Sequence, residues 1–315
     1  MKRSAAAIIL LTFFIVGCGG SANNDAANST NAGSAAPKVK KDYAELIKAI
    51  EPFFQPMGKP GKYDWLATFQ ESGQTFAEYL AADPKLPDTI RKTLYIQPIG
   101  NFSPEEKKAV DAAADYLQAF YQLKVKKLPS RQFPSKITKD DLRMRGYPSI
   151  RQIRTGYILD ELLKPKLPKD AAALIAFTNE DLYMTDTMNF VFGQASLEDR
   201  VAVWSLNRLE KNASPMLFLT RTLKIAAHET GHMFSMRHCT KYSCVMSGTN
   251  NLNETDSRPI DACPECTAKI IYLSKADAEK RYADLAKFAK QYGMTKEEKS
   301  FKEKQSAVKK INASP

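Results

Sequence analysis

"HETGHMFSMRHC", residues 228–239, holds all three histidines of a chain of 315 residues. His228 and His232 are four residues apart, so in a helix they lie one turn apart on the same face. This spacing lets two imidazoles ligate one Zn²⁺, and His238 is the natural third ligand because the chain has no other histidine. Three protein ligands leave one tetrahedral position open for water, as in catalytic zinc sites. The stretch therefore predicts a helix that ends at a metal site.

The residues around these histidines refine this prediction. Glu229 lies about 100° around the helix from His228, where it can reach a metal-bound water without occupying a coordination position. His238 is six residues beyond His232, and a straight helix would turn it about 240° away from the ligand face. The helix must therefore end and the chain must turn back before His238. HExxH alone is a weak signal, and a chance arrangement of core or surface histidines is the alternative.

Four cysteines follow closely in a second pattern. Cys239 and Cys244 form C-x₄-C, and Cys263 and Cys266 form C-x₂-C. Closely spaced pairs of this kind are typical of a four-thiolate structural zinc site, which leaves no position open for water. Disulfides are the alternative, because an exported protein could form them. Two disulfides in such tight loops would constrain little chain and would not gather four sulfurs.

The N-terminal residues predict export. Residues 1–17 have a basic start and a short apolar stretch that ends in "IVGC", which resembles the lipobox that precedes a lipid-modified cysteine, here Cys18. Residues 18–41 are poor in large apolar side chains and predict a flexible, lipid-anchored tether. We therefore expect attachment to a bacterial membrane (outer membrane and periplasm, or cell surface) without a spanning segment. An ordinary signal peptide and an uncleaved anchor are the alternatives.

The rest of the composition is that of a globular protein, with 43% hydrophobic and 26% charged residues. Residues 42–90 have helical apolar spacing broken by prolines and glycines, and predict an N-terminal wrapping segment with a packing role. The chain beyond them predicts an α/β (α+β) class with these elements: a strand at 91–100, a helix capped by Ser103, a helix at 147–163, a buried strand within 172–183, a strand at 200–209, and a helix from Ser214 through Met236.

Residues 276–315 form a basic helical tail in a chain of formal net charge +11. Such a tail could bind nucleic acid. A solvated helix face that favours anionic lipid headgroups fits an exported protein better, so we expect no nucleic-acid partner.

Taken together, these motifs resemble the metzincins, whose pattern is HExxHxxGxxH followed by a methionine turn. More narrowly they resemble the archaemetzincins, in which a cysteine follows the third histidine directly, and C-x₄-C spacing, a methionine and a later CxxC come after it. The corresponding residues here are His238, Cys239, Cys244, Met246 and "CPEC" at 263–266. The segments "TNEDLY", "NFVFGQA" and "RVAVWSLNRL" are also similar, so the resemblance covers about 91–275.

The resemblance implies a zincin-like metzincin fold: a twisted mixed sheet, a long active-site helix and a C-terminal segment stapled by zinc. It implies a zinc peptidase with aminopeptidase action ascribed to some members, and two zinc ions, one catalytic and one structural. The implied roles are as follows: His228, His232 and His238 as ligands of the catalytic zinc, Cys239, Cys244, Cys263 and Cys266 as ligands of the structural zinc, Glu229 as general base, Met246 as turn methionine, and Trp204 and Ser205 on the strand edge that pairs with the substrate backbone.

Two other functions and one departure from the family pattern stay open at this point. An endopeptidase acting on envelope proteins, or a non-catalytic zinc-binding lipoprotein, would carry the same ligands. Ser235 stands where the metzincin motif has glycine. Serine tolerates a positive φ poorly, so the bend is either strained or built differently.

Overall fold

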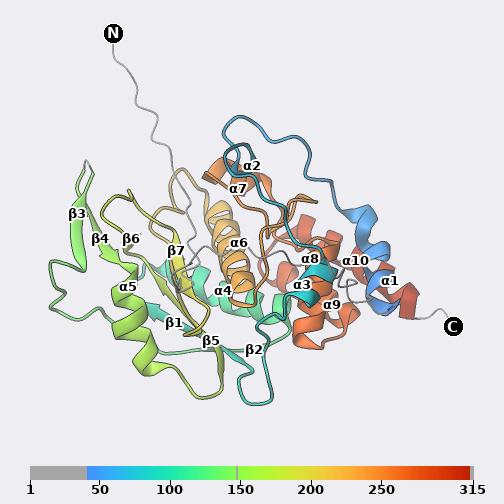
Figure 1. The fold of residues 1–315 in the computed structure, drawn as a ribbon, viewed down its shortest axis with the longest axis horizontal. Coiled ribbons are helices and arrows are strands. Elements are labelled where there is room, and N and C mark those ends of the chain that lie inside the picture. Colours follow the sequence, from blue (N-terminus) through green and yellow to red (C-terminus); the bar gives the residue numbers. More distant parts are fainter. Residues whose placement is uncertain (1–40, 147, 313–315) are drawn as a thin grey trace, which may run out of the picture.

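The computed structural model describes residues 41–146 and 148–312 (Figure 1). The predictions for the signal peptide (1–17), for Cys18 and for nearly all of the tether lie outside the described residues. Within the described ranges, no helix is both long enough and apolar enough to cross a membrane.

The described part of the chain begins and ends with helices, and its strands lie between them. In order they are α1 (Lys41–Ile50), η1 (Glu51–Phe53), α2 (Trp65–Thr68), α3 (Phe76–Ala81), β1 (Thr93–Ile99), α4 (Pro104–Tyr121), β2 (Lys124–Lys127), β3 (Leu142–Arg145), β4 (Ile150–Arg154), α5 (Thr155–Tyr157), η2 (Ile158–Leu163), η3 (Lys164–Lys166), β5 (Ala171–Thr178), β6 (Asp181–Tyr183), β7 (Gly193–Ser196), β8 (Val201–Ser205), α6 (Pro215–Met233), α7 (Leu252–Ser257), α8 (Pro264–Ser274), α9 (Ala278–Gln291) and α10 (Thr295–Asn312).

A five-stranded mixed sheet forms the centre of the fold, in the order β2-β1-β5-β8-β7. The first four strands are parallel, and β7 runs antiparallel to β8 at the edge. Every residue of β1, β5 and β8 is buried, because helices cover both faces of the sheet. The mixed α/β architecture expected from the sequence is confirmed.

Alternate residues of the strands enter two separate cores. Leu94 and Trp204 pack into the larger core with α4 and α6, whereas Tyr95 and Val203 face a smaller core with the helical turns at 155–166. The strand expected at 200–209 is observed at Val201–Ser205, and its side chains alternate between the two cores. This alternation gives the sheet one face that supports α6, the helix of the histidines, which lies at the centre of the molecule (Figure 1).

Helix starts follow the sequence signals. The side chain of Ser103 accepts a hydrogen bond from the backbone N–H of Glu106, and Glu106 returns one to Ser103, which completes the expected capping box of α4. Ser214 caps α6 in the same way by accepting from Leu217. Each cap satisfies a backbone donor that the first turn of the helix leaves without a partner.

The prediction of a helix at 147–163 is wrong for the first part of this range. Residues Ile150–Arg154 form strand β4, which pairs antiparallel with β3 and parallel with β6, and the helical turns begin only at Thr155. The side chain of Gln152 is buried and donates to Asp181 Oδ2 over 2.8 Å. Pairing with two neighbouring strands overrides the helical periodicity read from this segment.

The basic tail is more than a solvated surface. Tyr282, Phe288 and Phe301 on α9 and α10 are buried in the larger core. Lys304 Nζ lies 2.9 Å from Asp261 Oδ2, and both residues are only 4% exposed at the side chain. The buried guanidinium of Arg281 lies 3.5 Å from the same aspartate, so the tail is anchored beside the cysteine-bearing α8.

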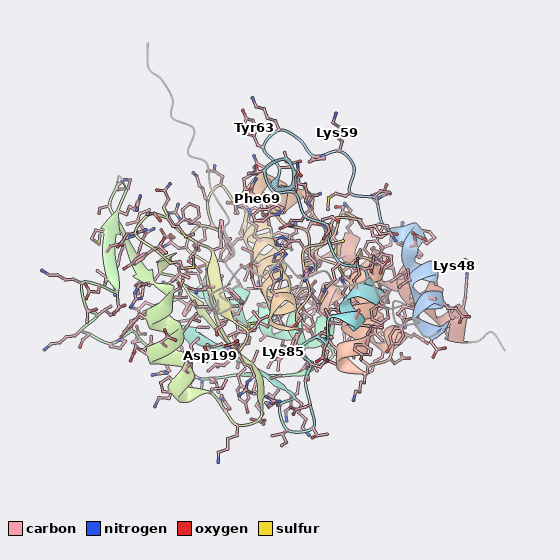
Figure 2. All side chains as sticks on the ribbon, viewed as in Figure 1. Lys48, Lys59, Tyr63, Phe69, Lys85 and Asp199 are labelled. Atoms are coloured by element: carbon pink, nitrogen blue, oxygen red, sulfur yellow. The ribbon has the colours of Figure 1, made fainter. Side chains whose placement is uncertain are left out.

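Residues 42–90 wrap one side of the molecule. The backbone N–H of Met57 donates to the carbonyl of Lys241, and that of Ser243 donates to the carbonyl of Gln55, so this segment pairs with the loop after the third histidine. Figure 1 shows α2 beside α7, far from it in sequence. Lys59 and Tyr63 lie on the outer loop between η1 and α2 (Figure 2).

Candidate active site

The helix that carries the first two histidines ends in a tight turn. Helix α6 stops at Met233, three residues before the predicted end. The backbone N–H of Ser235 donates to the carbonyl of His232, and that of Met236 donates to the carbonyl of Gly231. Ser235 has φ 62°, so it takes the left-handed position of a Schellman motif, where glycine is preferred. The bend is therefore placed where the motif glycine would lie, and serine accepts the strain.

This turn brings the three histidines together. A ligand nitrogen from each of His228, His232 and His238 lies within 4.8 Å of the others, and Nε2 of His232 is 3.0 Å from Nε2 of His228. Nδ1 of His228 lies 2.8 Å from the carbonyl oxygen of Val245, and Nδ1 of His232 lies 2.6 Å from that of Met236. The geometry gathers all three predicted ligands.

The donor chemistry of these histidines fits a zinc ion. A carbonyl oxygen only accepts, so Nδ1 of His228 and of His232 must donate, and each neutral ring then directs a lone pair from Nε2. Burial, followed by the neighbouring histidines, lowers the pKa of His228 well below its usual value and that of His232 to about 3, so both rings are neutral. Two lone pairs facing each other at 3.0 Å repel unless a cation lies between them.

The third histidine is held by a residue that the sequence did not reveal. Nδ1 of His238 lies 2.9 and 3.0 Å from the two carboxylate oxygens of Glu71. Burial alone would raise the pKa of Glu71, but hydrogen bonds and charge at His238 lower it below the usual value. Glu71 lies in the wrapping segment, 167 residues from His238, and no spacing rule connects the two.

Glu229 is buried next to the first histidine. It is 3% exposed and follows His228 on α6, as the motif requires. Burial raises the pKa of Glu229 well above its usual value, and no other cause contributes. Glu229 lines the cleft together with His232 and His238.

Met246 lies directly beneath the histidine helix. A Cβ atom added to Gly231 would come 2.6 Å from Sδ of Met246 and 3.1 Å from the hydroxyl oxygen of Tyr121. The glycine between the two helical histidines therefore lets the methionine approach the backbone. Met246, the proposed turn methionine, thus packs against the helix between His228 and His232.

A cleft of about 560 Å³ opens over these residues. The wrapping segment forms one wall through residues 70–74, and strand β7 with Leu197 contributes another. Glu229, His232 and His238 line it together with the turn that follows α6. The candidate metal site is therefore reached from the cleft.

The prediction that Trp204 and Ser205 form the substrate-pairing edge is wrong. Their strand, β8, is paired on both sides, by β5 and β7, and both residues are at most 2% exposed. The edge strand is β7. A Cβ atom on Gly193 would lie 2.2 Å from the Trp204 ring, so the tryptophan packs across β7 from within the core.

Strand β7 presents backbone groups to the cleft instead. The N–H of Ser205 donates to the carbonyl of Phe192, which makes this pair a hydrogen-bonded one. Antiparallel pairs alternate, so the backbone groups of Gly193 and Ala195 point away from β8. Both residues line the cleft.

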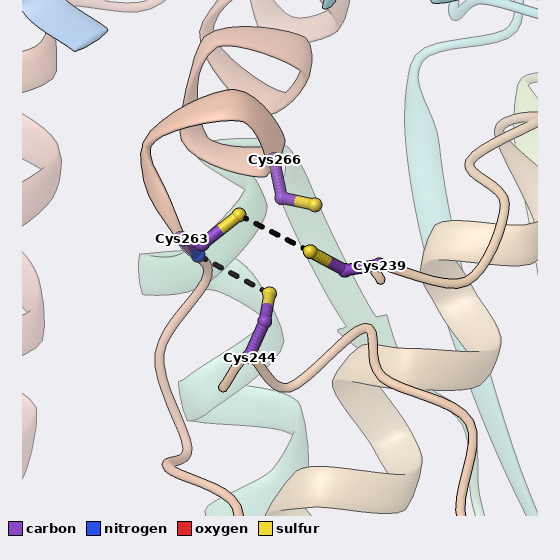
Figure 3. A group of neighbouring side chains, drawn as sticks. All are labelled: Cys239, Cys244, Cys263 and Cys266. Carbon is purple, nitrogen blue, oxygen red and sulfur yellow. Dashed lines mark hydrogen bonds between the residues drawn. The ribbon is translucent and has the colours of Figure 1, made fainter. Parts of the chain in front are cut away.

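The four cysteines also meet. Cys239, Cys244, Cys263 and Cys266 are buried and their sulfurs all lie within 4.8 Å of one another (Figure 3). Sγ of Cys239 is 3.5 Å from Sγ of Cys263, well beyond the length of about 2.05 Å for a disulfide bond, and all four thiols are free. The disulfide alternative is therefore not adopted in this structure.

Burial and mutual contact perturb the pKa values of the cysteine thiols. Burial, followed by hydrogen bonds with neighbouring cysteines, raises the pKa of the Cys244 thiol, whereas hydrogen bonds from Cys244, Cys263 and Cys266 lower that of Cys239. Four buried sulfurs at this spacing match the donor set of a tetrahedral structural zinc site.

Comparison with known proteins finds relatives of this chain. The model of the family described as "Peptidase family M54" matches residues 145–271. Archaemetzincin-2 of Homo sapiens is 31% identical over 280 residues, which cover 78% of this chain and 77% of the human protein. An archaemetzincin of Archaeoglobus fulgidus is 31% identical over 179 residues, which cover 57% of this chain and 99% of that protein. The crystal structure of an archaemetzincin from Methanopyrus kandleri is similar with 29% identity and a TM-score of 0.48, covering 60% of this chain and 99% of the other.

A histidine triad beside a buried glutamate, at the end of a helix that packs on a mixed sheet, defines a zinc metallopeptidase. The chain belongs to the archaemetzincin family. It is a zinc-dependent peptidase, a hydrolase whose substrates are peptides or proteins.

Proposed function

We propose that the protein is an aminopeptidase-like enzyme in which Glu229 activates the attacking water. The supporting observation is the position of Glu229: its carboxylate is buried on the helix of His228 and His232, and it lines the cleft. His228, His232 and His238 would hold a zinc ion, which would serve as the Lewis acid for the scissile carbonyl and the attacking water.

The protein residues carry the proton transfers. The carboxylate of Glu229 accepts a proton from the attacking water and passes it to the leaving amine. Burial raises the pKa of Glu229, which favours uptake of a proton by its carboxylate. The outward backbone groups of Gly193 and Ala195 are the natural partners for an extended substrate.

Glu229→Gln tests this mechanism. The variant keeps the side-chain volume and every metal ligand but loses the base, so peptide hydrolysis should fall by at least about 10²–10⁴-fold. Zinc content should stay that of the unsubstituted protein. Hydrolysis within about tenfold of the unsubstituted protein, with zinc still bound, would contradict the role of Glu229.

Amino-terminal cleavage is the finer part of the proposal, with internal cleavage as its alternative. A cleft of about 560 Å³ accommodates a short segment of substrate rather than a folded chain. A positional-scanning peptide library, with each peptide synthesised with a free and with an acetylated amino terminus, separates the two. Equal rates for both forms would indicate an endopeptidase.

We also propose two zinc ions per chain, a labile one at the histidines and a chelation-resistant one at the four cysteines. If the protein were instead a non-catalytic zinc-binding lipoprotein, it would need no buried glutamate beside the zinc ligands. Metal analysis before and after mild chelation should give two zinc ions and then one. A single zinc ion before chelation would contradict the proposal.

Export and lipid anchoring at Cys18 are a further part of the proposal, supported by the sequence pattern at 1–18. Cys18→Ser should release the protein from bacterial membranes without changing its peptidase activity. A variant that stays with the membrane after a high-salt wash would refute a single lipid anchor.

A further inference from the structure

Residues 65–74, which we call the strap, cross the metal site from outside the matched region 145–271. Both ends of the strap are fixed. The carboxylate of Glu254 accepts from the backbone N–H of Trp65 over 3.1 and 3.0 Å. Lys269 Nζ donates to the carbonyl oxygen of Gln74 over 2.5 Å and to its side-chain oxygen over 3.1 Å. The strap therefore has a defined path over the loop that carries His238.

Between these two anchors, the strap places Glu71 against His238. Both carboxylate oxygens lie within 3.0 Å of Nδ1, and the side chain of Glu71 is 30% exposed while that of His238 is 9% exposed. An ionised carboxylate only accepts hydrogen bonds, so Nδ1 of His238 carries the proton. Nε2 then presents its lone pair toward His228 and His232, whose ring centroids lie 5.2 and 5.0 Å away.

A second contact from the strap fixes the plane of the same ring. The Trp65 indole meets the His238 imidazole edge to face, with centroids 5.0 Å apart and an angle of 82° between the planes. The indole in turn packs against Gly248, where an added Cβ atom would come 2.5 Å from Cδ1 of Trp65. The ring of His238 is therefore constrained by a hydrogen bond at Nδ1 and by a packed wall.

His238 needs this support more than the other two histidines do. His228 and His232 are held by a helix, and their Nδ1 atoms lie against carbonyl oxygens of the loop that follows the same helix. His238 lies on a loop without regular structure, and its Nδ1 partner comes from the strap. We propose that Glu71 is a positioning residue that sets the tautomer and orientation of His238 and so completes the metal site. This inference rests on the histidine site of the proposed function but not on hydrolysis.

Three variants of the full folded chain test the proposal. Glu71→Ala removes the acceptor, and Glu71→Gln keeps an acceptor oxygen but removes the charge. Glu265→Gln is the matched control, because Glu265 accepts from the backbone N–H of Phe76 over 2.8 Å and pairs with Lys241 without touching a histidine.

The first measurement is the tautomer of the His238 ring. It is read by long-range ¹H–¹⁵N NMR of protein that is labelled at histidine and carries no zinc at the histidine site. Only three histidines contribute signals. We expect a proton on Nδ1 in the unsubstituted protein and in Glu71→Gln and Glu265→Gln, and a shift toward the Nε2-protonated form in Glu71→Ala. An unchanged tautomer in Glu71→Ala would overturn the proposal.

The second measurement is zinc affinity of the histidine site, by competition with a fluorescent chelator. Loss of the hydrogen-bond partner of a ligating histidine lowers metal affinity by about 10–100-fold. The zinc affinity of Glu71→Ala should therefore be lower by this factor, and that of Glu71→Gln should be reduced less. The zinc affinity of Glu265→Gln should stay within about twofold of that of the unsubstituted protein. Equal loss in Glu265→Gln and Glu71→Ala would assign the effect to docking of the segment and overturn the proposal. Neither measurement uses peptide hydrolysis, so a failure of hydrolysis in an unsubstituted protein that binds zinc would count against the proposed function alone.

Discussion

Replacing Ser235 by glycine tests how the chain turns from the helix to the third ligand. Ser235 has φ 62° and forms the left-handed position of the turn after α6. A side chain there costs roughly 1–2 kcal/mol, because Cβ approaches the following carbonyl oxygen. Ser235→Gly removes this cost without touching a metal ligand.

Two other effects oppose the gain. Glycine adds freedom to the unfolded chain, worth about 0.4–1 kcal/mol against folding. The substitution also removes Oγ of Ser235, which accepts from the backbone N–H of Lys85 over 3.0 Å at an exposed position, a bond worth about 0.5 kcal/mol. The free energy of unfolding should therefore change by between a small loss and a gain of about 1 kcal/mol.

Ser235→Ala is the matched comparison, because it loses the same hydroxyl but keeps Cβ. The glycine variant should be more stable than the alanine variant by about 1 kcal/mol, with equal zinc affinity. Urea unfolding of zinc-saturated protein measures both. If alanine were the more stable by about 1 kcal/mol, as at a helix-interior position, residue 235 would be helical and the turn would lie beyond it.

Three further perturbations follow from the site. Gly231→Ala should lower the free energy of unfolding by about 1–3 kcal/mol, because the new Cβ meets Sδ of Met246 at 2.6 Å; an unchanged urea midpoint would contradict this packing. Cys266→Ser should remove the chelation-resistant zinc and lower the melting temperature, whereas retention of that zinc would exclude Cys266 as a ligand. In zinc-free protein, the free energy of unfolding should fall as pH drops from 6.5 toward 3. Burial, and then the charge of His238, lower the pKa of His232 to about 3 in the folded protein. The unfolded state therefore binds more protons than the folded state between these pH values. Unfolding at stepped pH measures this slope, and His232→Gln should reduce it.

The parts of the site that could be predicted are those encoded by local spacing. The separation of His228 and His232 fixes them on one helix face, and the six-residue step to His238 requires a bend, which the structure places at Ser235. The capping residue Ser103 likewise defines the start of its helix within a few neighbouring positions. Such relations need only the geometry of a single turn.

The parts that could not be predicted depend on contacts between distant segments. Glu71 reaches His238 across 167 residues, and nothing in "FQESGQTF" distinguishes this carboxylate from a solvated one. The order of β7 and β8 in the sheet also depends on tertiary contacts. A strand pattern gives the alternation of Trp204 and its neighbours but not whether the strand lies at an edge, so the substrate-pairing edge was assigned to the wrong strand.

The buried side chain of Asp261, near the cysteines, limits how far the chain can be truncated. The family match ends at residue 271, yet the cations that neutralise Asp261 come from Arg281 and Lys304. Removing the partner of a buried charge costs about 3–5 kcal/mol, a large part of the 5–15 kcal/mol that stabilises an ordinary domain. A fragment trimmed to residues 145–271 would keep every proposed ligand residue and still unfold more readily. The bounds of the family match are therefore not bounds to which this chain can be shortened without loss of stability.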